Sequence, residues 1–110
     1  MGDILKNQAT NISSSTTETT ICTGANIGCT VLSFTICNDE TDDDGTFSIR
    51  VKDYSTSNTP YYIYKDQSLP RTSTFEHTDK IILMPNDTLT ITCSANQVYN
   101  ILVSYLEQTS

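Results

Sequence analysis

The stretch from Ile27 to Cys37 alternates between apolar and polar residues and is rich in β-branched and aromatic side chains. After a short acidic turn, residues 46–52 alternate again, so that Phe47, Ile49 and Val51 share one side of the chain. A period of two residues is that of a β-strand with one buried face and one face in water. These two runs therefore predict an all-β protein.

Turn-forming residues divide the rest of the chain into segments of strand length. We expect strands near residues 15–23, 27–37, 45–54, 60–66, 79–84, 87–94 and 97–107. Strands spaced by roughly 8–12 residues are typical of sandwiches and barrels. A chain of 110 residues is large enough for one core and too small for two. We therefore predict a single antiparallel β-sandwich, jelly-roll-like or Ig-like, of about seven to eight strands.

Residues 1–14 are polar, with Ile4, Leu5 and Ile12 as isolated apolar points. Such a segment cannot repay its ordering entropy by itself. We predict an extended N-terminal arm, residues 1–14, followed by a β-sandwich domain, residues 15–110. The arm would be tied to its own domain, to a sister subunit or to a different protein. The simplest alternative is a strand paired with its own sheet.

The apolar side of each predicted strand should build the core. The expected core residues are Ile21, Ile27, Leu32, Phe34, Ile36, Phe47, Ile49, Val51, Ile63, Ile81, Leu83, Leu89, Ile91, Cys93, Ile101, Val103 and Tyr105. Residues 81–84 and 101–103 carry more apolar side chains than one sheet face can bury, and residues 61–64 hold three tyrosines. Such a surplus is typical of subunit interfaces, with burial under loops or the arm as the alternative. The predicted interface residues are Ile4, Leu5, Ile12, Tyr61, Tyr62, Tyr64, Ile82, Met84 and Leu102.

The charge balance excludes two classes of partner. The chain has 13 acidic and six basic side chains, a formal net charge of −7. Nucleic acids and anionic membranes are bound by clustered Lys and Arg, and here the basic residues are scattered singly. The first residues resemble no secretory signal, and the apolar run at residues 81–84 is too short to cross a bilayer. We expect a protein made in the cytoplasm that binds neither nucleic acid nor membrane.

The acidic turn from Asp39 to Asp44 offers carboxylates, which are ligands that Ca²⁺ prefers. An EF-hand with its glycine at Gly45 would require Glu at position 51, which is Val51. A looser calcium site remains open, with Asp42 and Asp44 as weak candidates. The simpler interpretation is a charged hairpin tip that deters edge-to-edge association.

Groups suited to catalysis are scarce. The one histidine, His77, lies in a polar segment beside Glu76 and Asp79, and no serine stands in a Gly-x-Ser-x-Gly elbow. A lone histidine in a polar loop is more often solvated than catalytic. We expect no catalytic residues, no cofactor and no enzymatic activity.

The four cysteines, Cys22, Cys29, Cys37 and Cys93, include no C-x-x-C pair, which argues against a zinc site. Cys29 and Cys37 lie in one predicted strand and share a face, too far apart to bond to each other. Cys22 could bond across strands with Cys29 or Cys93. In a protein made in a reducing cytoplasm, the expected state is free thiols packed on strands.

The last third of the chain has a distinctive order of residues. Ile81 to Ile91 follows the pattern ϕ-x-L-x-P-x-D-x-L-x-ϕ, where ϕ is apolar, and Val103 to Glu107 follows V-S-Y-ϕ-E. This part resembles small virion structural proteins of tailed bacteriophages, particularly cyanophage-like ones. In those chains it forms a strand, a tight Pro-x-Asp turn, a strand and a final strand. Here Asn86 replaces a common Gly, and Asn tolerates the left-handed backbone of such turns.

The resemblance implies a structural role in a virion. The first expectation is a decoration or cement protein that binds the outer capsid surface, with the major capsid protein or other virion proteins as partners. The alternative is a neck, tail, baseplate or fibre component, or a carbohydrate- or receptor-binding sandwich. The arm would then lie along a neighbouring subunit. Residues 61–64 and 81–84 would form contacts in a homo-oligomer, a trimer being favoured. The location would be the virion, after synthesis in the host cytoplasm.

Overall fold

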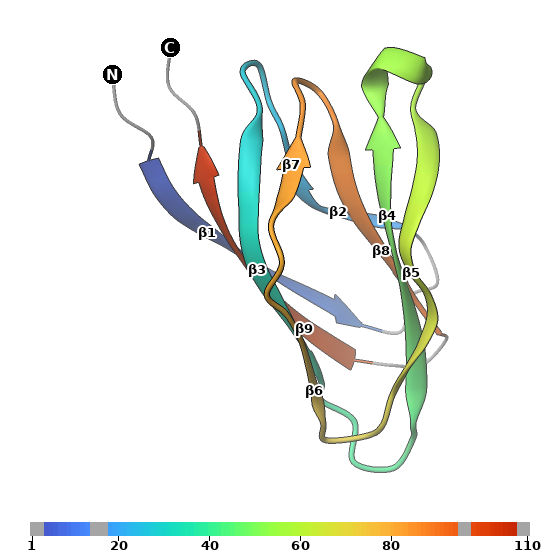
Figure 1. Cartoon of the computed structure of the whole chain (residues 1–110). Coiled ribbons are helices and arrows are strands. Elements are labelled where there is room, and N and C mark those ends of the chain that lie inside the picture. The colour runs from blue at the N-terminus through green and yellow to red at the C-terminus, as the bar shows by residue number, and fades with distance from the viewer. Residues whose placement is uncertain (1–3, 14–17, 95–97, 108–110) are drawn as a thin grey trace.

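The computed structural model describes residues 4–13, 18–94 and 98–107 (Figure 1). These residues form nine strands and one turn of 3-10 helix: β1 (Ile4–Ser13), β2 (Thr19–Thr23), β3 (Cys29–Asn38), β4 (Gly45–Asp53), η1 (Tyr54–Thr56), β5 (Thr59–Leu69), β6 (Thr74–His77), β7 (Ile81–Leu83), β8 (Thr88–Cys93) and β9 (Val98–Glu107). Within those ranges, no helix is long and apolar enough to span a membrane.

Two antiparallel sheets pack against each other (Figure 1). Sheet A has the strand order β1-β9-β3-β6, and β7 also pairs with β3. Sheet B has the order β2-β8-β4-β5. The chain crosses repeatedly between the sheets, so that neighbours within a sheet come from distant parts of the sequence. The predicted all-β sandwich is confirmed, with nine strands in the described part of the chain.

The core lies between the two sheets. Tyr99, Phe34 and Phe47 are its largest fully buried side chains. Most of the expected core residues are buried or pack against the buried cluster. Ile27 is an exception, because it lies in the turn after β2 and is 43% exposed, and Leu32 is outside the cluster. The buried apolar residues that the sequence interpretation missed are Ile12, Cys22, Cys29, Val31, Leu69 and Tyr99.

A β-bulge in β3 explains the error at Leu32. The register between β3 and β9 shifts between Val31 and Ser33. Val31 and Phe34 are both fully buried although they are three residues apart, while Leu32 and Ser33 between them are only half-buried. A bulge adds one residue to one strand and reverses which face of the sheet each following side chain occupies.

The same bulge corrects the expectation for two cysteines. Cys29, before the bulge, faces the core and is 3% exposed, whereas Cys37, after it, is half-buried on the other face of sheet A. The two do not share a face, because the alternation is interrupted between them. All four cysteines of the chain are free thiols in this structure.

The N-terminal segment is extended and belongs to sheet A. β1 pairs with β9 in unbroken antiparallel register, from Ile4 opposite Glu107 to Ser13 opposite Val98. Ile12 points into the core and is 5% exposed. This pairing supplies the contacts that a polar segment needs to remain ordered. Residues 4–13 thus form the simplest alternative to a free arm, a strand paired with its own sheet. The predicted boundary between residues 14 and 15 lies outside the described residues.

The expectation of a solvated His77 in a loop is wrong. His77 ends strand β6, lies opposite Phe34 in β3 and is 7% exposed. Its ring stacks on Phe34 with 4.7 Å between ring centroids, and its Nδ1 lies 2.7 Å from the hydroxyl of Tyr64. Its Nε2 is buried without a hydrogen-bond partner among the described residues. The strand was missed because Phe75 is the only strongly apolar residue of β6.

The acidic turn is not a hairpin tip, because it connects β3 of sheet A to β4 of sheet B. Its start is fixed by Asn38, which is fully buried. The Asn38 amide donates to the carbonyl oxygen of Leu69 at 3.0 Å, and its side-chain oxygen accepts from the backbone N–H of Glu40 at 3.0 Å. The turn is therefore an anchored connection between the two sheets.

Candidate interaction surface

The outer face of sheet A is formed by every second residue of its strands. The residues between them, such as Tyr99, Ile101 and Val103 of β9, are buried in the core. The cross-strand register places the outward residues side by side. We define this outer face by Leu5, Asn7, Ala9 and Asn11 of β1, Asn100, Leu102, Ser104 and Leu106 of β9, Thr30, Ser33, Thr35 and Cys37 of β3, Thr74 and Glu76 of β6, and Ile82 of β7.

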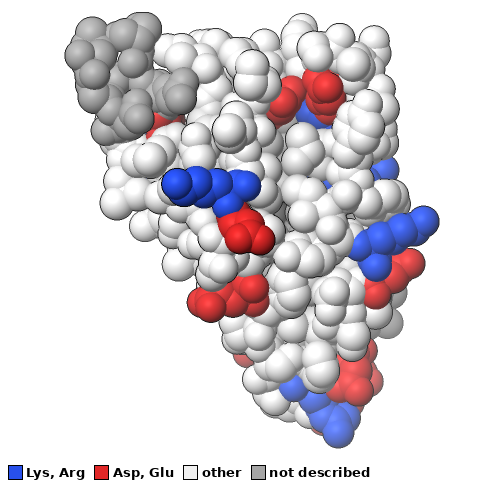
Figure 2. All heavy atoms as spheres, in the orientation of Figure 1, with Lys and Arg blue, Asp and Glu red and all other residues white. Residues whose placement is uncertain are grey.

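This outer face is almost uncharged. Glu76, on the edge strand β6, is its single charged member, although the chain as a whole carries a net charge of −7. Figure 2 shows that charged side chains in that view lie in small separate groups, with uncharged surface between them. A surface without charge can be covered by another protein without the free-energy cost of desolvating ions.

One row of the outer face is apolar. The register aligns Leu5 with Leu106, Leu106 with Thr30, and Thr30 with Ile82, across strands β1, β9, β3 and β7. Leu5 is 69% exposed and Ile82 is 68% exposed. Met84, which is also exposed, follows Ile82 by two residues on the same side of the chain. We call Leu5, Leu106, Ile82 and Met84 the apolar row, which Thr30 interrupts between Leu106 and Ile82; exposed apolar residues grouped on one face mark protein-interaction sites.

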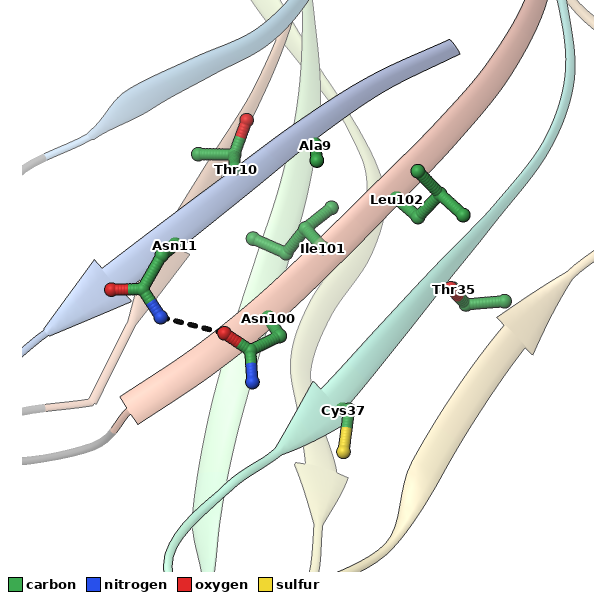
Figure 3. A pocket seen from close by; sticks show the side chains of 8 residues that line it. All are labelled: Ala9, Thr10, Asn11, Thr35, Cys37, Asn100, Ile101 and Leu102. Carbon is green, nitrogen blue, oxygen red and sulfur yellow. Dashed lines mark hydrogen bonds between the residues drawn. The ribbon is translucent and has the colours of Figure 1, made fainter.

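A hollow lies further along the same face, where β1, β9 and β3 meet (Figure 3). It has a volume of about 430 Å³ and is lined by Ala9, Thr10, Asn11, Thr35, Cys37, Asn100, Ile101 and Leu102. The Asn11 amide donates to the side-chain oxygen of Asn100 at 2.6 Å, and the Asn100 amide donates to Asp39 at 3.3 Å. The lining offers amide groups, the hydroxyl groups of two threonines, methyl groups and one thiol. It is therefore suited in size and polarity to an apolar or amide side chain of a partner.

Four of the predicted interface residues lie on or beside this face: Leu5, Ile82, Met84 and Leu102. Two others on β1 do not. Ile4 is 45% exposed but alternates to the inward side of the strand, and Ile12 is part of the core.

The predicted tyrosines are elsewhere, on strand β5 of sheet B. Tyr61 and Tyr62 are exposed, and two cations lie over the Tyr62 ring, with Arg50 at 5.5 Å and Lys65 at 5.2 Å from its centroid. Tyr64 packs against the core and hydrogen-bonds to His77. The structure therefore does not bring the tyrosines and the apolar row together, because they belong to different sheets.

The outer face of sheet B carries a charged cluster around Glu18, which lies just before β2. Glu18 accepts hydrogen bonds from Arg50 at 2.6 and 2.9 Å, from Lys52 at 2.5 Å and from the hydroxyl of Thr90 at 2.7 Å. Burial by itself would raise the pKa of Glu18, but the bonds from Lys52, Thr90 and Arg50 outweigh burial and lower the pKa to about 2. The cluster ties the start of β2 to β4 and β8.

The two weak calcium candidates, Asp42 and Asp44, both hydrogen-bond to Arg71. The Asp44 carboxylate accepts from the backbone N–H of Arg71 at 3.1 Å, while Asp42 offers its backbone oxygen to the Arg71 guanidinium at 3.0 Å. Among residues 4–13, 18–94 and 98–107, no three His, Cys, Asp or Glu side chains gather as a metal site. The turn is instead held by Arg71 and Asn38.

Several outer-face residues were missed by sequence reasoning, notably Asn7, Asn11, Asn100 and Ser104. A signal was present for the two residues of β9, because the outward positions Asn100, Leu102, Ser104 and Leu106 include no Lys, Arg, Asp or Glu. An ordinary solvent-exposed strand face carries such charges. The absence of charge on the outward side of β9 therefore distinguishes it from an ordinary solvent-exposed strand face.

The fold has relatives among solved structures, although no protein-family model and no curated protein matches the chain. Five chains of solved structures match. One is a chain of the acidic-stable capsid of Helicobacter pylori bacteriophage KHP30, with a TM-score of 0.62 and 9% sequence identity. The match covers 97% of this chain and 90% of that chain. At this identity the likeness shows a shared β-sandwich fold over nearly the whole length of both chains.

Proposed function

We propose that this chain is a structural protein of a bacteriophage virion, which attaches to other virion proteins through the outer face of sheet A. The observation that carries the proposal is the contrast between a strongly acidic chain and one broad face with a single charged residue and an apolar row. The fold shared with a phage capsid chain supports it, as does the resemblance of the C-terminal part to phage virion proteins.

The outer face supplies both parts of a docking surface. The apolar row provides area whose removal from water favours binding, by about 25 cal/mol for each Å². The amides of Asn7, Asn11 and Asn100 provide donors and acceptors that fix orientation. Sheet B, with the Glu18 cluster and Lys65, would remain in solvent and keep the assembled particle soluble.

Within this proposal, a decoration or cement role fits best. A single small domain that binds with one face can sit on an outer capsid surface and bridge neighbouring subunits of the shell. We propose the major capsid protein as its partner and a homo-oligomer, with a trimer favoured, as its bound form. We propose no enzymatic activity. A place in the neck, tail, baseplate or fibre is the second arrangement compatible with the same surface.

A second candidate function rests on the exposed tyrosines. Tyr54, Tyr61 and Tyr62 are each more than half exposed and lie on η1 and the adjoining start of β5. Exposed aromatic rings beside polar groups can stack on sugar rings. This group favours a receptor- or carbohydrate-binding module, and it lies on sheet B rather than on the outer face of sheet A.

The first experiment is quantitative mass spectrometry of purified particles, which counts copies of this chain against the major shell protein. A count equal to the shell protein, or a simple fraction of it, supports a decoration or cement role. A few copies to a few dozen would move the chain to the neck, tail or fibre apparatus. Absence from particles would contradict the virion role and favour the receptor-binding module.

Paired variants then test the surface. Leu102→Lys places a charge in the middle of the outer face, and Tyr61→Lys places the same charge on sheet B. Both positions are exposed, so both variants should fold. We expect the Tyr61→Lys protein to bind to particles or shells and the Leu102→Lys protein to fail to bind. Binding by the Leu102→Lys protein together with loss of binding by the Tyr61→Lys protein would mean that the binding site includes the tyrosines instead.

A further inference from the structure

Two buried thiols face each other across the sandwich. Cys22 lies in β2 of sheet B and Cys29 begins β3 of sheet A, and their sulfur atoms are 3.8 Å apart. Cys22 is 1% exposed and Cys29 is 3% exposed. Of the other two cysteines, Cys93 is buried in β8 and Cys37 lies on the outer face of sheet A. Within the described residues, Cys22 and Cys29 are therefore the cysteine pair whose sulfur atoms are close enough to interact.

Local irregularities in both strands create this approach. The register of β2 against β8 shifts between Thr20 and Cys22, so that Ile21 and Cys22, although adjacent, are both buried. Cys29 precedes the bulge of β3 and faces inward. The Cys29 thiol also lies 3.6 Å from the carbonyl oxygen of Thr23, to which it donates.

The turn between the two cysteines is held in one conformation. The backbone N–H of Gly24 donates to the carbonyl oxygen of Asp87 at 2.8 Å, and that of Gly28 donates to the carbonyl oxygen of Gly24 at 2.7 Å. A Cβ atom at Gly24 would overlap the carbonyl oxygen of Met84. Gly28 has φ = 103°, which strongly favours glycine. The sequence therefore provides the two residues that allow the chain to reverse here and bring the thiols together.

We propose that Cys22 and Cys29 form an intersheet disulfide when the folded protein meets a small-molecule disulfide such as oxidised glutathione. The disulfide would form in the isolated chain, whatever the chain attaches to. A sulfur–sulfur bond is about 2.05 Å long, so the two atoms must approach by roughly 1.8 Å. Rotation of the two side chains within the existing turn can supply a movement of that size.

The reaction balances as two thiol–disulfide exchanges. One cysteine thiolate attacks oxidised glutathione, forms a mixed disulfide and releases the first glutathione thiol. The second cysteine then attacks the protein sulfur of the mixed disulfide and releases the second glutathione thiol. The protein loses two protons and two electrons, and oxidised glutathione gains them as two thiols. The balance is the same whichever cysteine reacts first.

Burial makes the thiol–disulfide exchange slow and dependent on local opening of the structure. Burial and the neighbouring Cys29 raise the pKa of Cys22 to about 12, and burial also raises the pKa of Cys29. At neutral pH both sulfurs are therefore protonated thiols, which are poor nucleophiles. The pair should stay reduced in a reducing cytoplasm and oxidise over hours outside it, when the 23–28 turn opens locally.

The bond would join the two sheets at the end of the molecule that carries the apolar row. Cys29 is the β3 residue paired with Leu83 of β7 and Glu107 of β9, next to Ile82 and Leu106 of the row. Figure 1 shows the β2–β3 connection at the same end of the sandwich as the start of β1 and the end of β9. Closing a loop of this length is expected to raise the melting temperature by about 5–10 °C.

The test is intact-mass spectrometry of the purified full chain after incubation with oxidised glutathione at about pH 8, compared with the reduced protein. We expect a loss of about 2 Da, peptide mapping that links Cys22 to Cys29, and the stated rise in melting temperature. The Cys37→Ser protein should behave in the same way. Cys22→Ala and Cys29→Ala should lose both the mass change and the rise.

The wild-type mapping keeps the test decisive even where a variant fails to fold. Four thiols that remain free after prolonged oxidation, with the protein folded by circular dichroism, would overturn the proposal. So would a disulfide that joins a different pair of cysteines, or a stable mixed disulfide with glutathione at Cys22 or Cys29.

Discussion

At the scale of single residues, Asp87 links three loops at one end of the sandwich. It is 5% exposed, and its two carboxylate oxygens accept from the backbone N–H groups of Tyr54 at 2.9 Å and Met84 at 3.0 Å. Its own carbonyl oxygen accepts from Gly24. One carboxylate thus satisfies backbone groups of η1 and of the β7–β8 turn, while its main chain fixes the β2–β3 turn.

Replacement of Asp87 by alanine should destabilise the fold by about 1–3 kcal/mol, because two backbone donors lose their acceptor. Denaturant unfolding followed by circular dichroism measures this loss. Asp53→Ala is the comparison variant, because the Asp53 carboxylate accepts from the exposed backbone N–H and hydroxyl of Ser55, where water can take its place. Equal stability of the two variants would show that water replaces the Asp87 carboxylate without penalty.

The Glu18 cluster predicts a pH dependence of stability. The folded-state pKa of Glu18 is about 2, below its ordinary value of 4.5, so ionised Glu18 stabilises the fold above that ordinary value. This contribution is lost as the pH falls toward 2. Glu18→Gln should therefore be less stable than wild type at pH 7, by about 1–2 kcal/mol after solvent screening.

The difference in unfolding free energy between wild type and Glu18→Gln should shrink between about pH 5 and pH 2. Urea titrations at several pH values measure it. A difference that stays constant down to pH 2 would mean that the stabilisation comes from packing of the side chain and not from its charge.

At the scale of elements, the β2–β3 turn depends on close contact with the β7–β8 turn. A Cβ atom at Gly24 would meet the Met84 carbonyl, which is backbone and cannot rotate away. Gly24→Ala should therefore lower stability by about 1–3 kcal/mol through overpacking. Asn26→Ala, in the same turn but exposed, should change stability little. Thermal melts of the two variants compare them, and similar melting temperatures would contradict the tight contact.

Strand β1 gives an element-scale prediction that differs from that for a free arm. Because β1 covers the whole edge of β9 and buries Ile12, removal of residues 1–13 should destabilise the sandwich and expose β9 as a bare edge. Bare edges promote association between chains. Size-exclusion chromatography and melting curves of the truncated protein test this. A monomeric truncated protein of unchanged stability would restore the interpretation as an arm.

Much of the fold follows from local pattern, and the errors have local causes. The strands around Phe34, Phe47 and Ile101 were predictable because their alternation is strong. Which of Val31 and Leu32 faces the core was not predictable, because both are apolar. Only the pairing of β3 with β9 fixes the position of the bulge. Strand β6 is short and mostly polar, and it exists because β3 offers a free edge.

At the scale of the whole molecule, the two sheets have different chemistry on their outer faces. Sheet B carries the Glu18 cluster and the cations beside Tyr62, whereas the outer face of sheet A is nearly neutral. This asymmetry could not be derived from the sequence, because it depends on which strands share a sheet. The individual exposed residues Leu5, Ile82 and Leu102 were predictable as an apolar surplus, but their common face was not.

The neutral outer face predicts how attachment to a virion responds to salt. Between ~0.05 M and ~0.5 M salt, binding through charged groups weakens strongly, while burial of apolar and amide groups changes little or strengthens. We expect the affinity of this chain for shells or particles to change by less than about threefold over that range.

Lys65→Glu, which alters the charge on sheet B, should show the same weak dependence of affinity on salt. Sedimentation of particles with the labelled chain measures both. A steep loss of binding with salt would place the contact on the charged surfaces instead, and a changed salt dependence in Lys65→Glu would locate it on sheet B.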